Sequence, residues 1–127
     1  MEITFPGGMA VEAHFKQFSV LTDQPSAYGG QNSAPAPFDL FLASLATCAG
    51  YYALRFCRER GLSTDGLKLA LETEKDSEKH RLSKLRIAIN LPVDFPEKYR
   101  QAIIRATGQC SVKRVILAPP EIEVTII

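Results

Sequence analysis

The architecture of this chain follows from one uncharged run, Phe41-Leu-Ala-Ser-Leu-Ala-Thr-Cys-Ala-Gly-Tyr-Tyr-Ala-Leu54. The run has the composition of a helix, and it is apolar on every side. Such a helix has to be buried all round, whereas a helix that lies on one sheet keeps a polar face toward water. Cys48 lies within the run, so the sequence predicts a thiol inside a buried helix.

The whole helix is predicted to begin at Pro37 and to end before Gly61. Proline is tolerated in the first helical turn, where Asp39 also places a carboxylate near the positive end of the helix dipole. Glycine is favoured just past a helix C-terminus, and Arg58 and Arg60 add positive charge there. A chain this short can hardly surround such a helix alone, so we expect a homodimer in which a second copy covers it.

Length and charge bound the class of protein. The 127 residues suit one domain, so we expect a single domain over residues 1–127. Lysine and arginine (15) nearly balance aspartate and glutamate (14), and no basic run indicates a nucleic-acid partner. The N-terminus lacks a signal-peptide pattern and no apolar stretch reaches the ~20 residues of a membrane span, which predicts a cytoplasmic protein without membrane contacts.

No metal site and no cofactor are predicted. His14, His80 and the three cysteines lack the paired spacing of metal ligands. The glycines do not form a nucleotide-binding loop either. Three cysteines in a reducing compartment favour inert or reactive thiols over structural disulfides.

Alternation of apolar and polar residues predicts strands on both sides of the helix. The predicted strands cover residues 3–5, 9–15, 18–22, 67–75 and 82–91. The first three would form an antiparallel meander and the last two a hairpin with a polar tip. A loop rich in proline, glycine and small residues, Pro25 to Pro37, would join the meander to the helix.

The C-terminal part adds two helices and a strand. Asp94 and Glu97 have capping-box spacing before an apolar-periodic run that Gly108 can end. Cys110 opens a short basic and apolar segment, predicted to be helical, and a closing strand is predicted over residues 122–127. This order of elements indicates an α+β fold with antiparallel sheets.

Two segments resemble the OsmC-like and organic hydroperoxide resistance (Ohr) family. They are Pro35-Ala-Pro-Phe-Asp-Leu-Phe-Leu-Ala-Ser-Leu-Ala-Thr-Cys48 and Cys110-Ser-Val112. The resemblance implies an OsmC-like fold, in which antiparallel sheets wrap around a long central cysteine-bearing helix, and an intertwined homodimer with two interface sites. It also implies a thiol-dependent peroxidase in which Cys48 attacks an organic hydroperoxide, Cys110 resolves the product, and a cellular dithiol is the reductant.

This chemistry suits the residue types. A thiolate is the nucleophile, and it becomes a sulfenic acid that a nearby thiol converts to a disulfide. The predicted substrate pocket consists of Phe41, Leu45, Tyr51 and Tyr52. Such a pocket would favour alkyl hydroperoxides over hydrogen peroxide, because each buried methylene contributes about 0.8 kcal/mol.

The chain departs from the family pattern in the groups that activate the thiolate. Family members resemble one another in an acidic residue directly after the proline, paired with an arginine from the N-terminal region. Here Phe38 follows Pro37, and no arginine precedes Arg55. Asp39 is either a displaced substitute or simply the carboxylate of the helix dipole, and we favour the second interpretation.

The other charged groups and the third cysteine each allow a functional and a purely structural interpretation. His14 and Lys16 would reach the site only if the meander folds over it, and solvated positions are the simpler interpretation. Cys110 would lie beside Lys113 and Arg114, whose positive charge favours a thiolate unless both point to water. Cys57 falls on the opposite helix face from Cys48 and is predicted to be inert.

Two functions from different classes remain at this level. The first is a peroxidase in oxidative-stress defence, with Cys48 and Cys110 cycling through a disulfide. The second is a binding or redox-sensing module, in which the same interface pocket holds a small apolar molecule. The proximity of the two sulfurs and the presence of a cation near Cys48 would favour the first.

Overall fold

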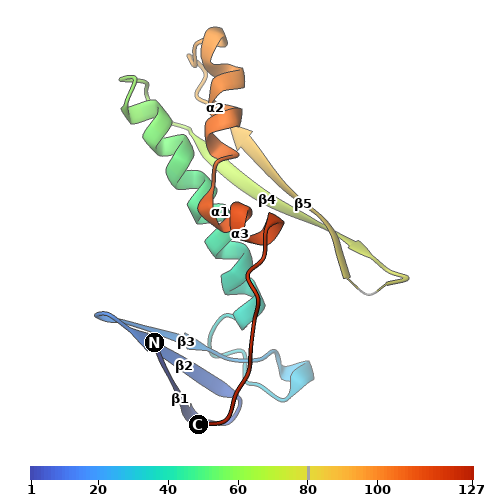
Figure 1. Cartoon of the computed structure of the whole chain (residues 1–127). Coiled ribbons are helices and arrows are strands. Elements are labelled where there is room, and N and C mark those ends of the chain that lie inside the picture. The colour runs from blue at the N-terminus through green and yellow to red at the C-terminus, as the bar shows by residue number, and fades with distance from the viewer. Residues whose placement is uncertain (80) are drawn as a thin grey trace. The chain divides into compact units, whose positions relative to one another are not determined.

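The computed structural model describes residues 1–79 and 81–127 as two compact units, Met1–Ala43 and Ser44–Ile127 (Figure 1). In chain order the elements are β1 (Glu2–Gly7), β2 (Ala10–Phe15), β3 (Phe18–Thr22), η1 (Ser26–Tyr28), α1 (Pro37–Arg58), β4 (Lys68–Asp76), β5 (Arg81–Asn90), η2 (Glu97–Tyr99), α2 (Arg100–Thr107) and α3 (Ser111–Leu117). Both sheets are antiparallel, so the predicted α+β class is confirmed. His80 lies outside the described residues, and the prediction of a single domain stays a prediction.

The first unit contains the predicted meander, with strand order β1-β2-β3. Ala13 of β2 lies opposite Ile3 of β1 and Val20 of β3. Because alternate side chains of a strand share a face, this register collects the apolar residues on one side of the sheet. Lys16 forms the turn between β2 and β3 with a φ of 53° and is exposed.

A single carboxylate organises the loop between β3 and α1. Asp23 is only 3% exposed, and it accepts hydrogen bonds from the backbone N–H groups of Gln24 (2.7 Å), Gln31 (3.0 Å) and Ser33 (3.0 Å) and from the Ser33 hydroxyl (2.8 Å). These donors, with the Ser33 N–H the strongest, lower the pKa of Asp23 to about 2. The loop that looks like low-complexity sequence therefore has a defined conformation.

The ends of α1 follow the predicted local signals. The Asp39 carboxylate accepts a hydrogen bond from the Ala36 N–H (3.1 Å), which supports the helix-terminal interpretation of this residue. At the other end the Gly61 N–H bonds to the Arg58 carbonyl (3.2 Å), and Gly61 has a φ of 62°. A left-handed glycine just past the last turn is a common helix ending.

Within the second unit, one side of α1 is buried. The buried residues of this helix are Leu45, Ala49, Ala53, Phe56 and Cys57. Tyr51 and Leu54, by contrast, are 56% and 36% exposed. The burial on all sides that the sequence predicts would thus need a further chain. By length and composition α1 could also cross a membrane, a property that it shares with core helices of soluble proteins.

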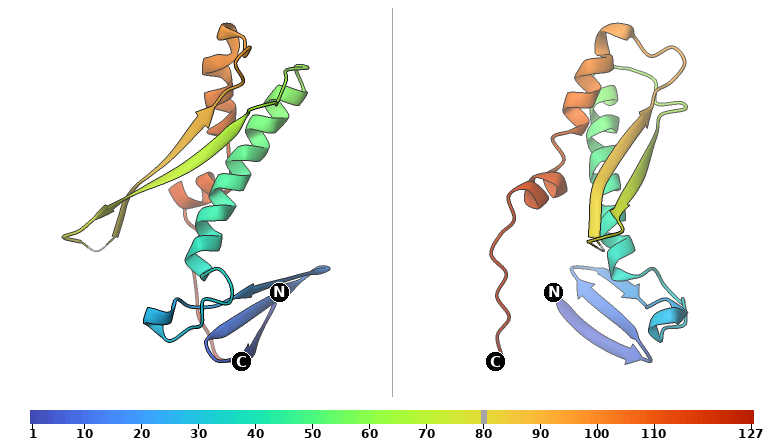
Figure 2. Two further views of the ribbon diagram at one scale, coloured as in Figure 1. Left: turned by 180° about the vertical axis from the view of Figure 1, so that it is seen from behind. Right: turned by 90° about the vertical axis from the view of Figure 1, so that its right-hand side faces the viewer.

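The second unit packs its helices and its hairpin around two apolar clusters. β4 and β5 pair with Leu69 opposite Ile89, as the predicted hairpin requires, and Figure 2 shows α1 and α2 side by side next to them. The first cluster consists of Ala53, Phe56, Cys57, Phe95 and Ile103. The second consists of Leu45, Ala49 and Cys110, with leucine and isoleucine side chains of β4 and β5 against them. The elements that carry the cysteines are therefore held together by apolar packing.

Two predictions for the C-terminal part are wrong. Asp94 caps no helix, because η2 starts after Pro96 without a side-chain cap, and Glu97 instead pairs with Arg100 (2.7 Å). Residues 122–127 form no strand, and their side chains are exposed. Alternation makes a strand only where a neighbouring strand satisfies its backbone groups, and no described strand pairs with this segment.

Candidate active site

The structure brings Cys48 and Cys110 together and keeps Cys57 apart. Cys48 lies on α1, Cys110 directly precedes α3, and both belong to the cluster around Leu45 and Ala49. Cys48 packs against the cluster that contains Cys110, and each thiol is close enough to shift the pKa of the other. Cys57 is fully buried in the other cluster, where burial raises the pKa of its thiol, in agreement with the predicted inert role.

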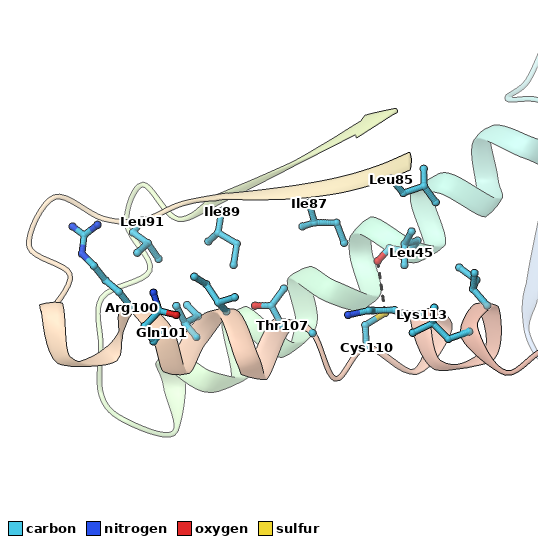
Figure 3. Close-up of a pocket in the computed structure, with 15 residues that line it drawn as sticks. Leu45, Leu85, Ile87, Ile89, Leu91, Arg100, Gln101, Thr107, Cys110 and Lys113 are labelled. Carbon is cyan, nitrogen blue, oxygen red and sulfur yellow. Dashed lines mark hydrogen bonds between the residues drawn. The ribbon is translucent and has the colours of Figure 1, made fainter. Parts of the chain in front are cut away.

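Cys110 is held in place by its position at the start of α3. Its backbone is extended (φ −48°, ψ 126°), while its carbonyl already accepts the Arg114 N–H (3.1 Å). Its side chain is fully buried, with the sulfur 3.8 Å from the Leu45 carbonyl oxygen (Figure 3). The single S–H of Cys110 therefore has two acceptors within reach, this carbonyl and the Cys48 sulfur.

The surroundings polarise the two thiols in opposite directions. Burial raises the pKa of Cys48, but the Cys110 thiol, the N–H groups of Val112 and Ser111 and the charge of Arg114 lower it by more, so the net pKa is lowered. For Cys110, burial and then the hydrogen bond with Cys48 raise the pKa. The geometry thus favours a thiolate on Cys48 and a proton on Cys110.

The positive charge of Arg114 contributes to the lowered pKa of Cys48, in addition to its predicted place beside Cys110. Its Nη2 donates to the Ser111 hydroxyl (3.4 Å), which is also 3.3 Å from the hydroxyl of Tyr52 on α1. This chain of contacts joins α3 to α1 beside Cys48. The sequence contains a signal for this position. Arg114 follows Cys110 by four residues, and residues four apart lie on the same face of a helix.

Three predicted auxiliary residues belong to the first unit, and each has a local role there. His14 on β2 lies between two hydroxyls, with Nε2 3.1 Å from Thr4 Oγ1 and Nδ1 2.8 Å from Ser19 Oγ. Lys16 forms the β2–β3 turn, and Asp39 binds the backbone at the start of α1. These contacts describe each residue within the first unit, and an auxiliary part in catalysis stays a prediction.

The four predicted pocket residues are distributed over different surroundings. Leu45 lines a cavity of about 680 Å³, which Figure 3 shows, and Tyr52 lines a separate groove of about 370 Å³. Phe41 stacks on Phe38 and is 37% exposed, and Tyr51 is exposed. Over residues 1–79 and 81–127, no three His, Cys, Asp or Glu side chains come close enough to hold a metal ion.

Three of the solved structures with similar folds come from named bacteria. A protein of Psychrobacter arcticus 273-4, described as an osmotic stress induced and detoxification response protein, aligns with a TM-score of 0.74 at 23% identity, over 89% of this chain and 84% of that chain. A Vibrio cholerae protein described as an organic hydroperoxide resistance protein, with captopril bound in one of its active sites, aligns at 0.53 and 19% identity, over 92% and 83%. A Legionella pneumophila organic hydroperoxide resistance protein, described as a predicted redox protein, aligns at 0.51 and 16% identity, over 89% and 90%.

At these identities the three likenesses establish the fold alone. No curated protein sequence matches the chain. The family model described as OsmC-like protein, however, matches residues 30–125. This range contains α1 with Cys48, and α3 with the preceding Cys110. The chain therefore belongs to the OsmC-like protein family.

Proposed function

We propose that the chain is a thiol-dependent peroxidase that reduces organic hydroperoxides, with Cys48 as the attacking thiolate and Cys110 as the resolving thiol. The observation that carries this proposal is the contact between the two thiols together with the opposite directions of their pKa shifts. A lowered pKa increases the fraction of Cys48 that is thiolate, the form that acts as nucleophile. A protonated thiol in contact with it is placed to attack the oxidised sulfur.

The reaction has two steps on the protein and one with a reductant. The Cys48 thiolate attacks the terminal oxygen of the hydroperoxide and the O–O bond breaks. The sulfur becomes a sulfenic acid, and the leaving alkoxide takes a proton from water to become the alcohol. The Cys110 sulfur then attacks the sulfenic sulfur, a disulfide forms and water leaves. A cellular dithiol returns two electrons and two protons by thiol–disulfide exchange, which restores both thiols.

Apolar surroundings support an organic rather than an inorganic peroxide as substrate. Leu45, Tyr52 and Val112 lie in the cluster that Cys48 contacts. Two of the proteins with similar folds are described as organic hydroperoxide resistance proteins. An alkyl group buried among these side chains would strengthen binding by about 0.8 kcal/mol per methylene.

A homodimer in the cytoplasm is part of the proposal. Large apolar side chains are exposed both on α1, at Tyr51 and Leu54, and along the C-terminal segment, at Ile122, Val124 and Ile126. Exposed apolar surface of this extent is typical of an interaction site. Sedimentation equilibrium would give the mass of two chains, and a mass of one chain at micromolar concentration would contradict this part.

The proposal is tested by mixing the reduced protein with cumene hydroperoxide in the absence of a reductant. We expect one equivalent of hydroperoxide to be consumed per chain, faster than by free cysteine. Peptide mapping should then show a disulfide between Cys48 and Cys110. Consumption no faster than by free cysteine would refute the peroxidase and leave the binding or sensing module as the better hypothesis.

Replacement of Arg114 by methionine should raise the pKa of the Cys48 thiol, because the positive charge of Arg114 stabilises the thiolate. Below the pKa of this thiol, alkylation of Cys48 by iodoacetamide would slow by up to about fivefold, the range of a solvent-exposed charge contact. At high pH both proteins carry a thiolate, so the rates converge. Peptide mapping at several pH values isolates the reaction of Cys48.

Lys113→Met is the matched control for Arg114→Met. Both changes remove one positive charge from α3, but Lys113 acts on the site through its backbone N–H, which the substitution keeps. The alkylation profile of this control should match that of the unmodified chain. Equal shifts in the two variants would mean that net charge alone, rather than the position of Arg114, sets the reactivity of Cys48.

A further inference from the structure

A cavity of about 680 Å³ lies between β5, α2 and α3 in the second unit (Figure 3). Its volume falls within the range of small-molecule sites, roughly 300 to 1,000 Å³. Leu85, Ile87 and Ile89 of β5 form one wall, and isoleucines of α2 and α3 line much of the rest. Cys110 borders the cavity, whereas Cys48 is not among its lining residues.

One polar side chain in this cavity lacks a partner. Thr107, the last residue of α2, is 6% exposed, and its hydroxyl has no hydrogen-bond partner among the residues that the structure describes. Buried hydroxyls in native proteins nearly always make a hydrogen bond, and each exception needs an explanation. A ligand atom in the cavity would supply the missing partner.

The charge of the cavity indicates the kind of ligand atom. Arg100 and Lys113 line the cavity, and no aspartate or glutamate does. Arg100 is already paired with Glu97, but Lys113 folds back toward α2, with its Nζ 3.7 Å from the place that a Cβ on Gly108 would take. The Lys113 ammonium is therefore next to the residue that follows Thr107. A carboxylate would satisfy both groups, since it accepts hydrogen bonds from an ammonium and from a hydroxyl.

We infer that this cavity is a binding site for a straight-chain aliphatic carboxylate, with the carboxylate at Thr107 and Lys113 and the alkyl chain along Leu85, Ile87 and Ile89. Figure 3 shows these two polar residues on the wall opposite the β5 side chains. The apolar walls would take up the alkyl chain of the ligand, and the two donors would select its charged end. This binding site goes beyond the proposed peroxidase, because it requires no thiol chemistry.

Decanoate is a suitable probe, titrated by calorimetry into the reduced full-length chain and into its Cys48→Ser variant, in which peroxide chemistry is absent. We expect saturable binding in both, and binding of decanol that is about tenfold weaker, equal to the loss of one charge-assisted hydrogen bond. Thr107→Val should weaken decanoate binding by a similar factor, and Thr107→Ser, which keeps the hydroxyl, should not. Lys113→Met should remove the preference for decanoate over decanol.

Thr47→Val is the matched control, because Thr47 lies on α1 outside the lining of the cavity. Its affinity for decanoate should equal that of the unmodified chain. Thr107→Val is expected to keep its melting temperature, since it removes a hydroxyl that has no partner in the described structure. The inference is overturned if decanoate does not saturate a site, if decanol binds as tightly, or if Thr107→Val and Lys113→Met bind decanoate normally.

Discussion

Replacement of Cys48 by serine will lower the rate of hydroperoxide reduction by at least about a thousandfold, because the variant loses the nucleophile itself. Cys110→Ser will act differently. The first equivalent of hydroperoxide will still be consumed, since Cys48 keeps its thiol, the N–H groups of Ser111 and Val112 and the charge of Arg114. Turnover with a dithiol will fall, because no second thiol remains beside the sulfenic acid to form the disulfide.

The two variants are separated by what accumulates on Cys48. Dimedone, which reacts with sulfenic acids, should label Cys48 in the Cys110→Ser variant and leave the unmodified chain largely unlabelled. Cys57→Ala is the matched control, because Cys57 is fully buried in the first apolar cluster, which contains neither Cys48 nor Cys110. It should consume hydroperoxide at the normal rate. Equal rates in the Cys48→Ser variant and the unmodified chain would remove Cys48 from the mechanism.

Local signals were sufficient to predict most of the elements. Pro37 and Gly61 mark the ends of α1 through backbone preferences that act over a few residues. Alternating residues likewise predicted the strands of both sheets, which pair with their sequence neighbours through short turns. The failed strand at residues 122–127 has the same alternation. It differs because no described strand pairs with it, so its backbone groups gain no hydrogen bonds from a sheet.

The candidate site depends on contacts that no local pattern contains. Cys48 and Cys110 meet because β4, β5 and α2 return the chain to α1. The family resemblance paired the two cysteines, but it could not show that the charge of Arg114 acts on Cys48. The unpartnered hydroxyl of Thr107 could not be predicted either, because the sequence does not tell whether the hydroxyl of a helical threonine has a hydrogen-bond partner.

The loop at Asp23 illustrates the same limit in the first unit. Three of its four donors come from Gln31 and Ser33, several residues further along a segment that consists mostly of proline, glycine and small polar residues. No periodicity reports such a contact, because the carboxylate binds backbone N–H groups rather than matching side chains. The same loop brings two stretches of backbone close together at Gly30.

Substitution of Gly30 by alanine will destabilise the chain by at least about 3 kcal/mol, the upper part of the range for an overpacked site. A Cβ at this position would lie 1.8 Å from the carbonyl oxygen of Gln24 and 2.4 Å from its carbonyl carbon. Neither backbone atom can move freely, because this oxygen accepts the Asn32 N–H (3.2 Å) and the Gln24 N–H binds Asp23. Relief of the clash would therefore open the Asp23 loop.

Gly29→Ala is the control for Gly30→Ala, because it also replaces a loop glycine but brings the new Cβ into no close contact. Gly29 has a φ of 85°, and a Cβ there would meet only Met9 Cγ at an ordinary 3.9 Å. Its cost should be limited to the left-handed backbone, about 1 to 2 kcal/mol. Urea unfolding followed by circular dichroism gives both values. Equal costs in the two variants would show that the approach of Gln24 to Gly30 does not constrain the loop, whereas a larger cost for Gly30→Ala would show that the loop before α1 is held by backbone packing.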